Sequence, residues 1–258
     1  MARMAPATAA FFDLDKTIIA RSSSLVFSKP FMAGGLISRR MMLRSAYAQF
    51  LYVVGTANHD QVERLRQFMT QMCAGWDVAT VREIVGDTLH HIVDPLVYDE
   101  AVSLIEEHHA AGRDVIVVST SGAEVVGPIS AMLGADDFVA TRLEIVDGRY
   151  TGNIDYYAYA EEKARAIRDL AETRGYDLAE CYAYSDSITD VHMLRAVGHP
   201  SAVNPDKELR KVATEEGWPV LTFARPVTLR SRIPVRQALA TLAVGGAVAG
   251  IVWAGSRR

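Results

Sequence analysis

The sequence predicts an α/β fold: a doubly wound, mostly parallel sheet with an inserted α-helical cap domain and a C-terminal apolar helix. Three observations lead to this prediction. Short β-branched or apolar runs such as 114–118 alternate with helical patterns, which is typical of buried parallel strands. Strand signals stop between residues 20 and 96, where only helical periodicity continues. An uncharged segment, 238–254, follows the last predicted strand.

These patterns divide the chain into three parts. The core is expected at 1–19 and 97–225, the helical insert at 20–96, and a basic linker with the apolar helix at 226–258. Half of the 258 residues are apolar, enough to bury a core of this size. The formal net charge of −4 gives no sign of nucleic-acid binding. The two cysteines lie far apart and form no metal-ligand cluster, so reduced core residues of a cytosolic protein are expected.

The first strand, predicted at 9–12, is followed by two carboxylates. Asp13 and Asp15 share a face at the carboxyl end of this strand, where open α/β sheets bind ligands. Adjacent anions repel each other unless a positive group is shared between them, and a divalent cation bridging to a phosphate would serve. On this motif alone, a turn that happens to contain two aspartates is an equal alternative.

The insert is predicted to be a small helical bundle. Ser38, Asp60 and Asp77 are candidate N-caps of three amphipathic helices whose apolar stripes read as packing faces. Because it directly follows the first strand, the insert is a candidate lid over the site. Between Asp15 and Asp60 the chain carries six basic residues and no acidic one. This pattern is typical of a solvated basic face, or of a rim that attracts an anionic substrate or meets anionic lipid.

A helix at 98–111, ended by Gly112, leads to the strand at 114–118. That strand runs into Ser119-Thr120-Ser121-Gly122. A hydroxyl at a strand end, followed by backbone N–H groups that open a helix, makes an anion site. The alternative is structural, with Ser121 as a helix N-cap.

Further elements complete the predicted sheet. Two strands within 137–154, joined by a turn at Asp147-Gly148, precede a helix at 158–175 that carries Lys163. The strand at 180–184 ends in Ser185-Asp186, and Asp190 is expected one turn into the following helix, facing the loop. Carboxylates that converge there suit Mg²⁺, a hard ion that takes oxygen ligands. The remaining elements are predicted at 201–203, 206–216 and 220–223.

Four of these stretches, in this order, resemble the haloacid dehalogenase superfamily: 11–18, 115–119, Lys163 and 184–190. The nearest branch is the phosphoserine-phosphatase-like one, with a helical cap after the first strand. The resemblance implies a Rossmann-like core and an Mg²⁺-dependent phosphomonoester hydrolase that forms an aspartyl-phosphate on Asp13. Asp15 would then act as general acid and base.

The resemblance also implies the remaining site residues. Ser119, Thr120 and Lys163 would bind the phosphoryl group. Mg²⁺ would be held by Asp13, the backbone carbonyl of Asp15 and Asp186, with Asp190 as a ligand or in the layer behind the ligands. The substrate would be a small phosphorylated metabolite, phosphoserine-like or derived from glycerol or a lipid.

The chain departs from the pattern of this branch at two points. Phosphoserine phosphatases usually have a Glu nine positions after the nucleophile, where this chain has Ser22. This departure puts phosphoserine itself in doubt. Many family members have Gly-Asp where this chain has Ser185-Asp186, which adds bulk to the loop.

Two alternatives accompany this interpretation. Asp15-Lys16-Thr17 is similar to the phosphorylated motif of cation-pumping ATPases, but those need a bundle of transmembrane helices, which favours Asp13 as nucleophile. The second alternative is a non-catalytic or regulatory membrane-associated protein that keeps the phosphatase fold.

The segment 238–254 has about the minimum length for a helix that crosses a ~30 Å hydrocarbon core. Arginines flank it and are more numerous on its N-terminal side, which predicts a cytoplasmic catalytic domain anchored to the membrane. A terminal helix packed on the core or a disordered tail is the alternative.

Overall fold

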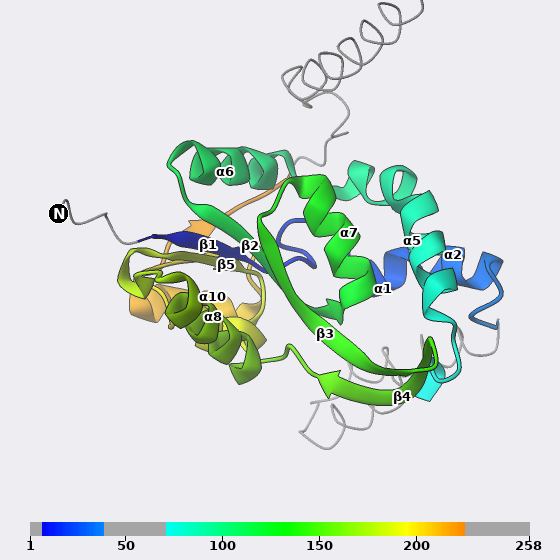
Figure 1. Ribbon diagram of the computed structural model, residues 1–258. Helices are drawn as coiled ribbons and strands as arrows, with labels where there is room; N and C mark the ends of the chain where they lie inside the picture. The colour runs from blue at the N-terminus through cyan, green and yellow to red at the C-terminus, as the bar shows by residue number, and fades with distance from the viewer. Residues whose placement is uncertain (1–6, 39–70, 225–258) are drawn as a thin grey trace, which may run out of the picture. The chain divides into compact units, whose positions relative to one another are not determined.

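The computed structural model describes residues 7–38 and 71–224, and the account below concerns these residues (Figure 1). Their centre is a seven-stranded sheet in the order β4-β3-β2-β1-β5-β6-β7. The strands are β1 (Ala9–Phe12), β2 (Asp114–Gly122), β3 (Asp137–Val146), β4 (Arg149–Tyr156), β5 (Tyr182–Ser185), β6 (His199–Val203) and β7 (Val220–Leu221). Every neighbouring pair is parallel except β3 and β4, which form an antiparallel hairpin. The predicted mostly parallel sheet and the turn at Asp147-Gly148 are confirmed.

The central strand β1 is buried along its whole length and pairs with β2 on one side and β5 on the other. Its last residue, Phe12, is level with Val117 of β2 and Tyr184 of β5. Because these three strands are parallel, their carboxyl ends meet at one edge of the sheet. The residues that follow them, Asp13 and Asp186 among them, are therefore brought together there.

Helices cover both faces of the sheet. They are α6 (Asp99–Ala110), α7 (Ala123–Leu133), α8 (Glu161–Arg174), α9 (Val191–Leu194) and α10 (Lys207–Glu216). Phe11 packs in a core with Ile167 of α8 and Leu209 of α10, whereas Phe12 contacts His108 of α6 on the opposite face. This alternation places α6 on one side of the sheet and α8 and α10 on the other, as Figure 1 shows. The expected doubly wound arrangement is confirmed.

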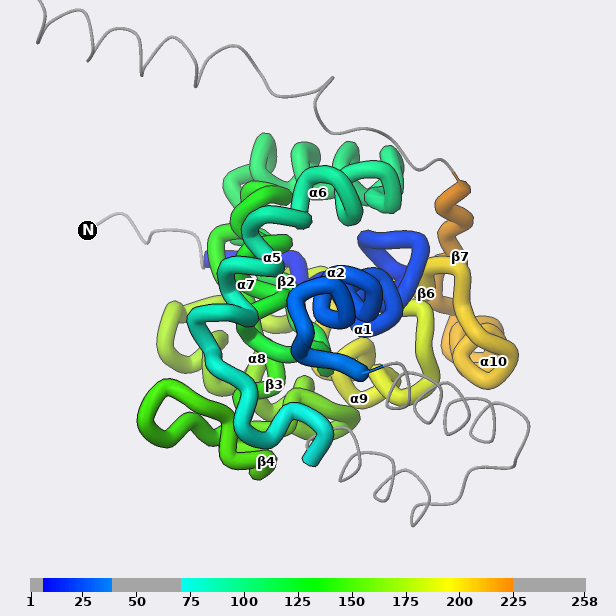
Figure 2. Tube along the Cα trace, turned by 90° about the vertical axis from the view of Figure 1, so that its right-hand side faces the viewer, coloured from blue at the N-terminus to red at the C-terminus, as the bar shows by residue number. Residues whose placement is uncertain are grey.

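The described part of the insert comprises α1 (Ser23–Val26), α2 (Ser28–Ala33), α5 (Val78–Ile92) and the short 3₁₀ turn η1 (Asp94–Leu96), which lie together in Figure 2. Asp77 caps α5 as predicted, accepting a hydrogen bond from the backbone N–H of Thr80 at 2.9 Å. The two ends of the insert meet, since Ala20 N–H donates to the Leu96 carbonyl at 2.8 Å. The helices expected to start at Ser38 and Asp60 fall largely outside the described residues.

One structural alternative and two local predictions were wrong. Ser121 does not cap α7, because β2 continues through it and Gly122 is the N-cap. The strand predicted from residue 180 starts at Tyr182, because Asp177 caps a 3₁₀ turn, η2 (Leu178–Glu180). Asp190 lies not inside a helix but at the end of another 3₁₀ turn, η3 (Ile188–Asp190), capped by the side chain of Ser187. Such side-chain caps compete with regular structure over one or two residues.

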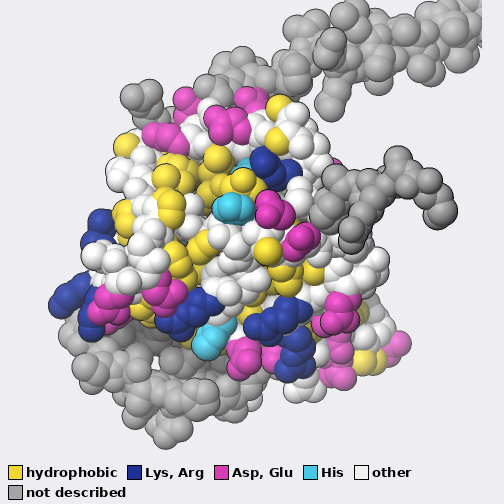
Figure 3. Space-filling view, turned by 90° about the vertical axis from the view of Figure 1, so that its left-hand side faces the viewer, with side chains coloured by type: hydrophobic (Ala, Val, Ile, Leu, Met, Phe, Trp, Pro, Cys, Tyr) yellow, Lys and Arg dark blue, Asp and Glu magenta, His cyan; other side chains and the backbone are white. Residues whose placement is uncertain are grey.

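Within the described ranges, no helix combines the length and apolar character needed to cross a bilayer. The basic linker and the apolar helix predicted at 226–258 lie outside these ranges. Figure 3 shows the side of the molecule from which β1 starts. Acidic and basic side chains are interspersed there around hydrophobic ones, unlike the continuous basic surfaces that bind nucleic acids.

We expect Gly198→Ala to destabilise the fold. A Cβ atom at this position would lie 1.7 Å from the backbone carbonyl oxygen of Ala179, so two backbone segments would have to separate. The expected loss is at least about 1–3 kcal/mol in the free energy of unfolding. Gly86→Ala is the matched control, because a Cβ there meets nothing within 4 Å and Gly86 lies inside α5. It should stabilise the protein by roughly 0.5–1 kcal/mol, and urea denaturation measures both changes.

Candidate active site

A buried lysine joins two carboxylates at the carboxyl edge of the sheet. Asp13 directly follows β1, and Lys163 Nζ donates to its Oδ1 at 2.6 Å. The same Nζ donates to Asp190 Oδ2 at 2.8 Å, and Ser185 Oγ donates to that oxygen at 2.7 Å. The side chains of Lys163, Asp13 and Asp190 are no more than 9% exposed. Residues far apart in the sequence thus form one buried hydrogen-bonded group.

The charges in this group constrain one another. Burial alone would lower the pKa of Lys163, but the charges of Asp13 and Asp190 outweigh it and raise this pKa, so the ammonium stays charged. Burial raises the pKa of Asp13, and Asp190 and Asp186 raise it further, while Lys163 opposes them. One buried ammonium therefore pairs with two carboxylates, and the nearby charge of Asp186 adds to the negative charge of the site.

Asp15 lies in a separate hydrogen-bonded group at the start of the insert. Its Oδ1 accepts from the backbone N–H of Ser23 at 2.8 Å. Its Oδ2 accepts from Ser23 Oγ and from Ser121 Oγ, each at 3.2 Å. Burial raises the pKa of Asp15, and the hydrogen bonds from Ser23 and Ser121 oppose that rise. Ser23 was not predicted from the sequence, although the run Ser22-Ser23-Ser24, which forms the N-cap and first two residues of α1, was a usable signal.

The two predicted phosphate-binding hydroxyls have different surroundings. Ser119 is almost fully buried at the carboxyl end of β2, and its Oγ accepts from the backbone N–H of Ser121 at 3.2 Å. Thr120 Oγ1 donates to the carbonyl of Ala158 at 2.9 Å, in the connection between β4 and α8. In this conformation the Thr120 hydroxyl holds that connection to β2.

Asp186, one of the predicted metal ligands, is a buried carboxylate at the same edge of the sheet. It lies directly after β5, and its one ion pair among the described residues is a long contact of 3.9 Å with the exposed Lys16. Burial raises the pKa of Asp186 to about 6, with a further contribution from Asp190 and opposition from Lys16. A buried carboxylate that lacks a close cationic partner suits a hard divalent cation, which binds oxygen ligands.

Asp13 and Asp186 follow β1 and β5 at the same edge of the sheet, and both carboxylates are buried. No group of three or more His, Cys, Asp or Glu side chains is arranged to hold a metal in the part of the chain described. The hydrogen bonds that Asp190 accepts from Lys163 and Ser185 both go to its Oδ2. Its role as a metal ligand or in the layer behind the ligands stays a prediction.

We expect Ser121→Ala to lower kcat about 10-fold or more while KM changes little. The substitution removes a hydrogen bond to the Asp15 carboxylate, and bonds to charged groups are worth about 1.5–3 kcal/mol. Ser130→Ala is the control, because Ser130 Oγ bonds only to the Val126 carbonyl of its own helix. Steady-state kinetics on purified variants would show equal kcat values for the two variants if Ser121 did not position Asp15.

The chain is similar to other proteins along most of its length. The chain is 61% identical over 241 residues to a probable phosphatase of Mycobacterium tuberculosis, covering 92% of this chain and 84% of that one. It is 58% identical over 262 residues to the "Inhibition of morphological differentiation protein" of Streptomyces azureus, covering 98% and 95% of the two chains.

Solved structures share the fold. A Bordetella pertussis protein of unknown function superposes with a TM-score of 0.74 at 27% identity, over 84% of this chain and 99% of that one. A substrate-bound phosphoserine phosphatase has a TM-score of 0.61 at 20% identity, over 88% and 97%, which supports the fold alone. The haloacid dehalogenase-like hydrolase profile matches residues 10–195, a span that contains Asp13, Asp15, Lys163, Asp186 and Asp190. This chain belongs to the haloacid dehalogenase-like hydrolase family.

Proposed function

We propose that this protein is an Mg²⁺-dependent phosphomonoester hydrolase that works through an aspartyl-phosphate on Asp13. The observation that carries the proposal is the buried contact of Lys163 with Asp13 and Asp190, at 2.6 and 2.8 Å. This contact places a fixed positive charge beside a carboxylate at the carboxyl edge of the sheet. The function of the curated relatives named as phosphatases agrees with it.

In the first step, an Asp13 oxygen attacks phosphorus and the bond from phosphorus to the leaving oxygen breaks. Asp15 donates a proton to that oxygen, so the product leaves as a neutral alcohol. In the second step, water attacks the phosphorus of the aspartyl-phosphate, and Asp15 accepts the proton that the water releases. Inorganic phosphate leaves and Asp13 is regenerated.

The other residues bind and orient the phosphoryl group. Lys163 holds Asp13 in place and stabilises the charge on the phosphoryl oxygens. Ser119 and Thr120 of β2 would bind the same phosphoryl group. Mg²⁺, held by Asp13, Asp186 and the backbone carbonyl of Asp15, would neutralise phosphoryl charge and reduce its repulsion of Asp13. Asp190 and Ser185 would keep Lys163 oriented.

A non-catalytic binding protein is the weaker candidate, because every polar group that the chemistry needs is present. The test is hydrolysis of p-nitrophenyl phosphate by the full chain with and without Mg²⁺. We expect turnover that requires the metal and disappears with a chelator. Protein that is folded by circular dichroism, is loaded with Mg²⁺ and hydrolyses no phosphomonoester would instead support the binding protein.

We also expect phosphoserine not to be strongly preferred over glycerol phosphates. Ser22 stands where a Glu would read the substrate ammonium, and its Oγ lies 3.5 Å from Asp15 Oδ2, facing the acid rather than offering a charge. Phosphate release measured for both compounds under the same conditions should give kcat/KM values within about 10-fold, since one missing charge partner costs limited discrimination. A preference for phosphoserine of several hundredfold would contradict this expectation.

A further inference from the structure

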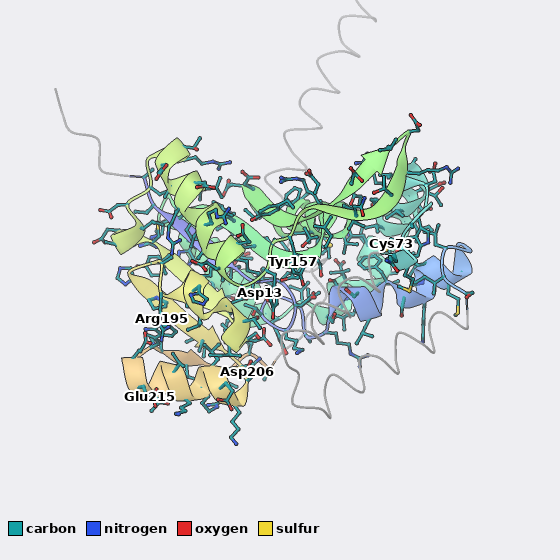
Figure 4. All side chains as sticks on the ribbon, turned by 90° about the horizontal axis from the view of Figure 1, so that it is seen from below. Asp13, Cys73, Tyr157, Arg195, Asp206 and Glu215 are labelled. Carbon is teal, nitrogen blue, oxygen red and sulfur yellow. The ribbon has the colours of Figure 1, made fainter. Side chains whose placement is uncertain are left out.

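A cavity of about 390 Å³ opens next to the candidate general acid. Ser23 and Ser121, which both donate to Asp15, are among its lining residues. Trp76 and Cys73 of the insert line it as well. In the view of Figure 4, Tyr157, another wall residue, lies between Asp13 and Cys73. The cavity therefore borders the two serines that hold the Asp15 carboxylate, and it has the volume of a small-molecule site.

The wall of this cavity is apolar and aromatic. Six aromatic side chains contribute to it: Phe27, Phe31, Trp76, Tyr150, Tyr157 and Tyr159. Aliphatic side chains such as Leu143 and Ile154 complete it from the β3–β4 hairpin. Among the described lining residues, the only charged one is Glu124, and none is a lysine, arginine or histidine.

The charge of Glu124 is already engaged. Its carboxylate lies 3.5 Å from Arg82 Nη2, and only 10% of its side chain is exposed. Burial raises the pKa of the neighbouring Tyr150 hydroxyl, and Glu124 raises it further, as expected when a carboxylate accepts from a phenol. The described lining residues therefore offer a ligand no cation that could pair with a carboxylate, and their one acid, Glu124, already interacts with Arg82 and Tyr150.

We propose that the alcohol released by this enzyme is uncharged and hydrophobic, so that the substrate class is phosphomonoesters of medium-length alkyl or aryl alcohols. The proposal deepens the function proposed above and rests on it. The phosphoryl group lies at Asp13 and Lys163, the ester oxygen lies at Asp15, and the apolar body fills the cavity between the insert and the β3–β4 hairpin. A zwitterionic leaving group such as serine would lose hydration there without gaining charge partners, which disfavours it.

The test is a series of n-alkyl phosphates, from ethyl through butyl and hexyl to octyl, each below its micelle concentration. Released inorganic phosphate gives kcat/KM for the full chain with Mg²⁺. Each buried methylene should raise kcat/KM about fourfold, so octyl phosphate, with six more methylenes than ethyl phosphate, should exceed it by about 4 × 10³-fold if all six are buried. Phosphoserine should fall below butyl phosphate. A flat series, or a preference for phosphoserine, would overturn the inference.

A charged variant and a matched control locate the effect. Ile154→Lys places an ammonium in the cavity wall, and we expect it to reduce the octyl-to-ethyl ratio of kcat/KM at least about 10-fold. Ile145→Lys is the same substitution at an exposed position of the same hairpin, 42% exposed and outside the cavity wall, and should leave the ratio unchanged. Equal ratios in both variants would contradict the placement, and the wild-type series stands even if Ile154→Lys does not fold.

The outcomes separate this inference from the proposed function. Hydrolysis of p-nitrophenyl phosphate that is lost in Asp13→Asn, together with a flat alkyl series, overturns the inference alone. Absence of Asp13-dependent hydrolysis for every phosphomonoester overturns the proposed function and the inference with it.

Discussion

Asp13→Asn is expected to lower kcat at least about 10³-fold, because an amide of nearly the same shape cannot attack phosphorus. The fold should persist, since the side chain keeps its volume and one oxygen that can accept from Lys163. Steady-state turnover of p-nitrophenyl phosphate measures the loss, and circular dichroism checks the fold.

The matched control is Asp155→Asn. The Asp155 side chain is 63% exposed, and its Oδ2 lies 3.4 Å from Arg142 Nε. This variant should retain wild-type kcat. Near wild-type turnover in Asp13→Asn, combined with loss of phosphate-analogue binding in Asp15→Asn, would show that the register is wrong and that Asp15 is the nucleophile.

Lys163→Met is expected to destabilise the protein by about 3–5 kcal/mol and to abolish turnover. It removes the one buried cation between Asp13 and Asp190 and leaves both carboxylates buried without it. Urea denaturation in the absence of divalent metal measures the change in the free energy of unfolding.

The control is Lys211→Met, because Lys211 is 70% exposed and its pair with Glu215 spans 3.9 Å. That substitution should change stability by no more than about 0.5 kcal/mol. Combining Lys163→Met with Asp190→Asn should recover part of the lost stability, since one of the unpaired charges is removed. Equal stability of Lys163→Met and wild type would contradict the buried ion pair.

Local patterns were sufficient to predict most of the fold. An apolar run located β1, a β-branched apolar run located β2, and the Asp147-Gly148 turn located the β3–β4 hairpin. Asp77 predicted the start of α5, because an N-cap hydrogen bond reaches only the third residue that follows, here Thr80. Errors fell where a short side-chain cap replaced regular structure, as at Asp177 and Ser187, because such competition involves about one hydrogen bond.

The site was predictable in its residue types but not in its contacts. The strand ends identified Asp13 and Asp186, since parallel strands place their carboxyl ends together. The pairing of Lys163 with Asp190 joins α8 to the turn after β5, and no local pattern encodes that distance. Ser121 is the clearest case, because its position before α7 suggested a cap, while in three dimensions its hydroxyl donates to Asp15, 106 residues away in the sequence.

In the insert, too, the sequence pattern predicted which faces are apolar but not what they contact. Its apolar stripes were interpreted as packing faces, and in α5 the residues Val78, Val81, Val85 and Leu89 are buried as expected. Some insert side chains also face the core domain. Phe27 and Trp76 line the cavity beside Asp15, together with residues of β2 and the β3–β4 hairpin. Helical periodicity reports that a face is apolar, but it does not report whether a neighbouring helix or a substrate covers that face.

The central claim is that Asp13 carries the phosphoryl group during turnover, and trapping that intermediate tests it most directly. Full-length protein is mixed with substrate and Mg²⁺, quenched in acid within one turnover and reduced with borohydride, which converts an aspartyl-phosphate into homoserine. Peptide mass spectrometry then locates the change. We predict homoserine at position 13 and unaltered aspartate at position 15. Homoserine at position 15, or none in protein that is turning over substrate, would contradict the account.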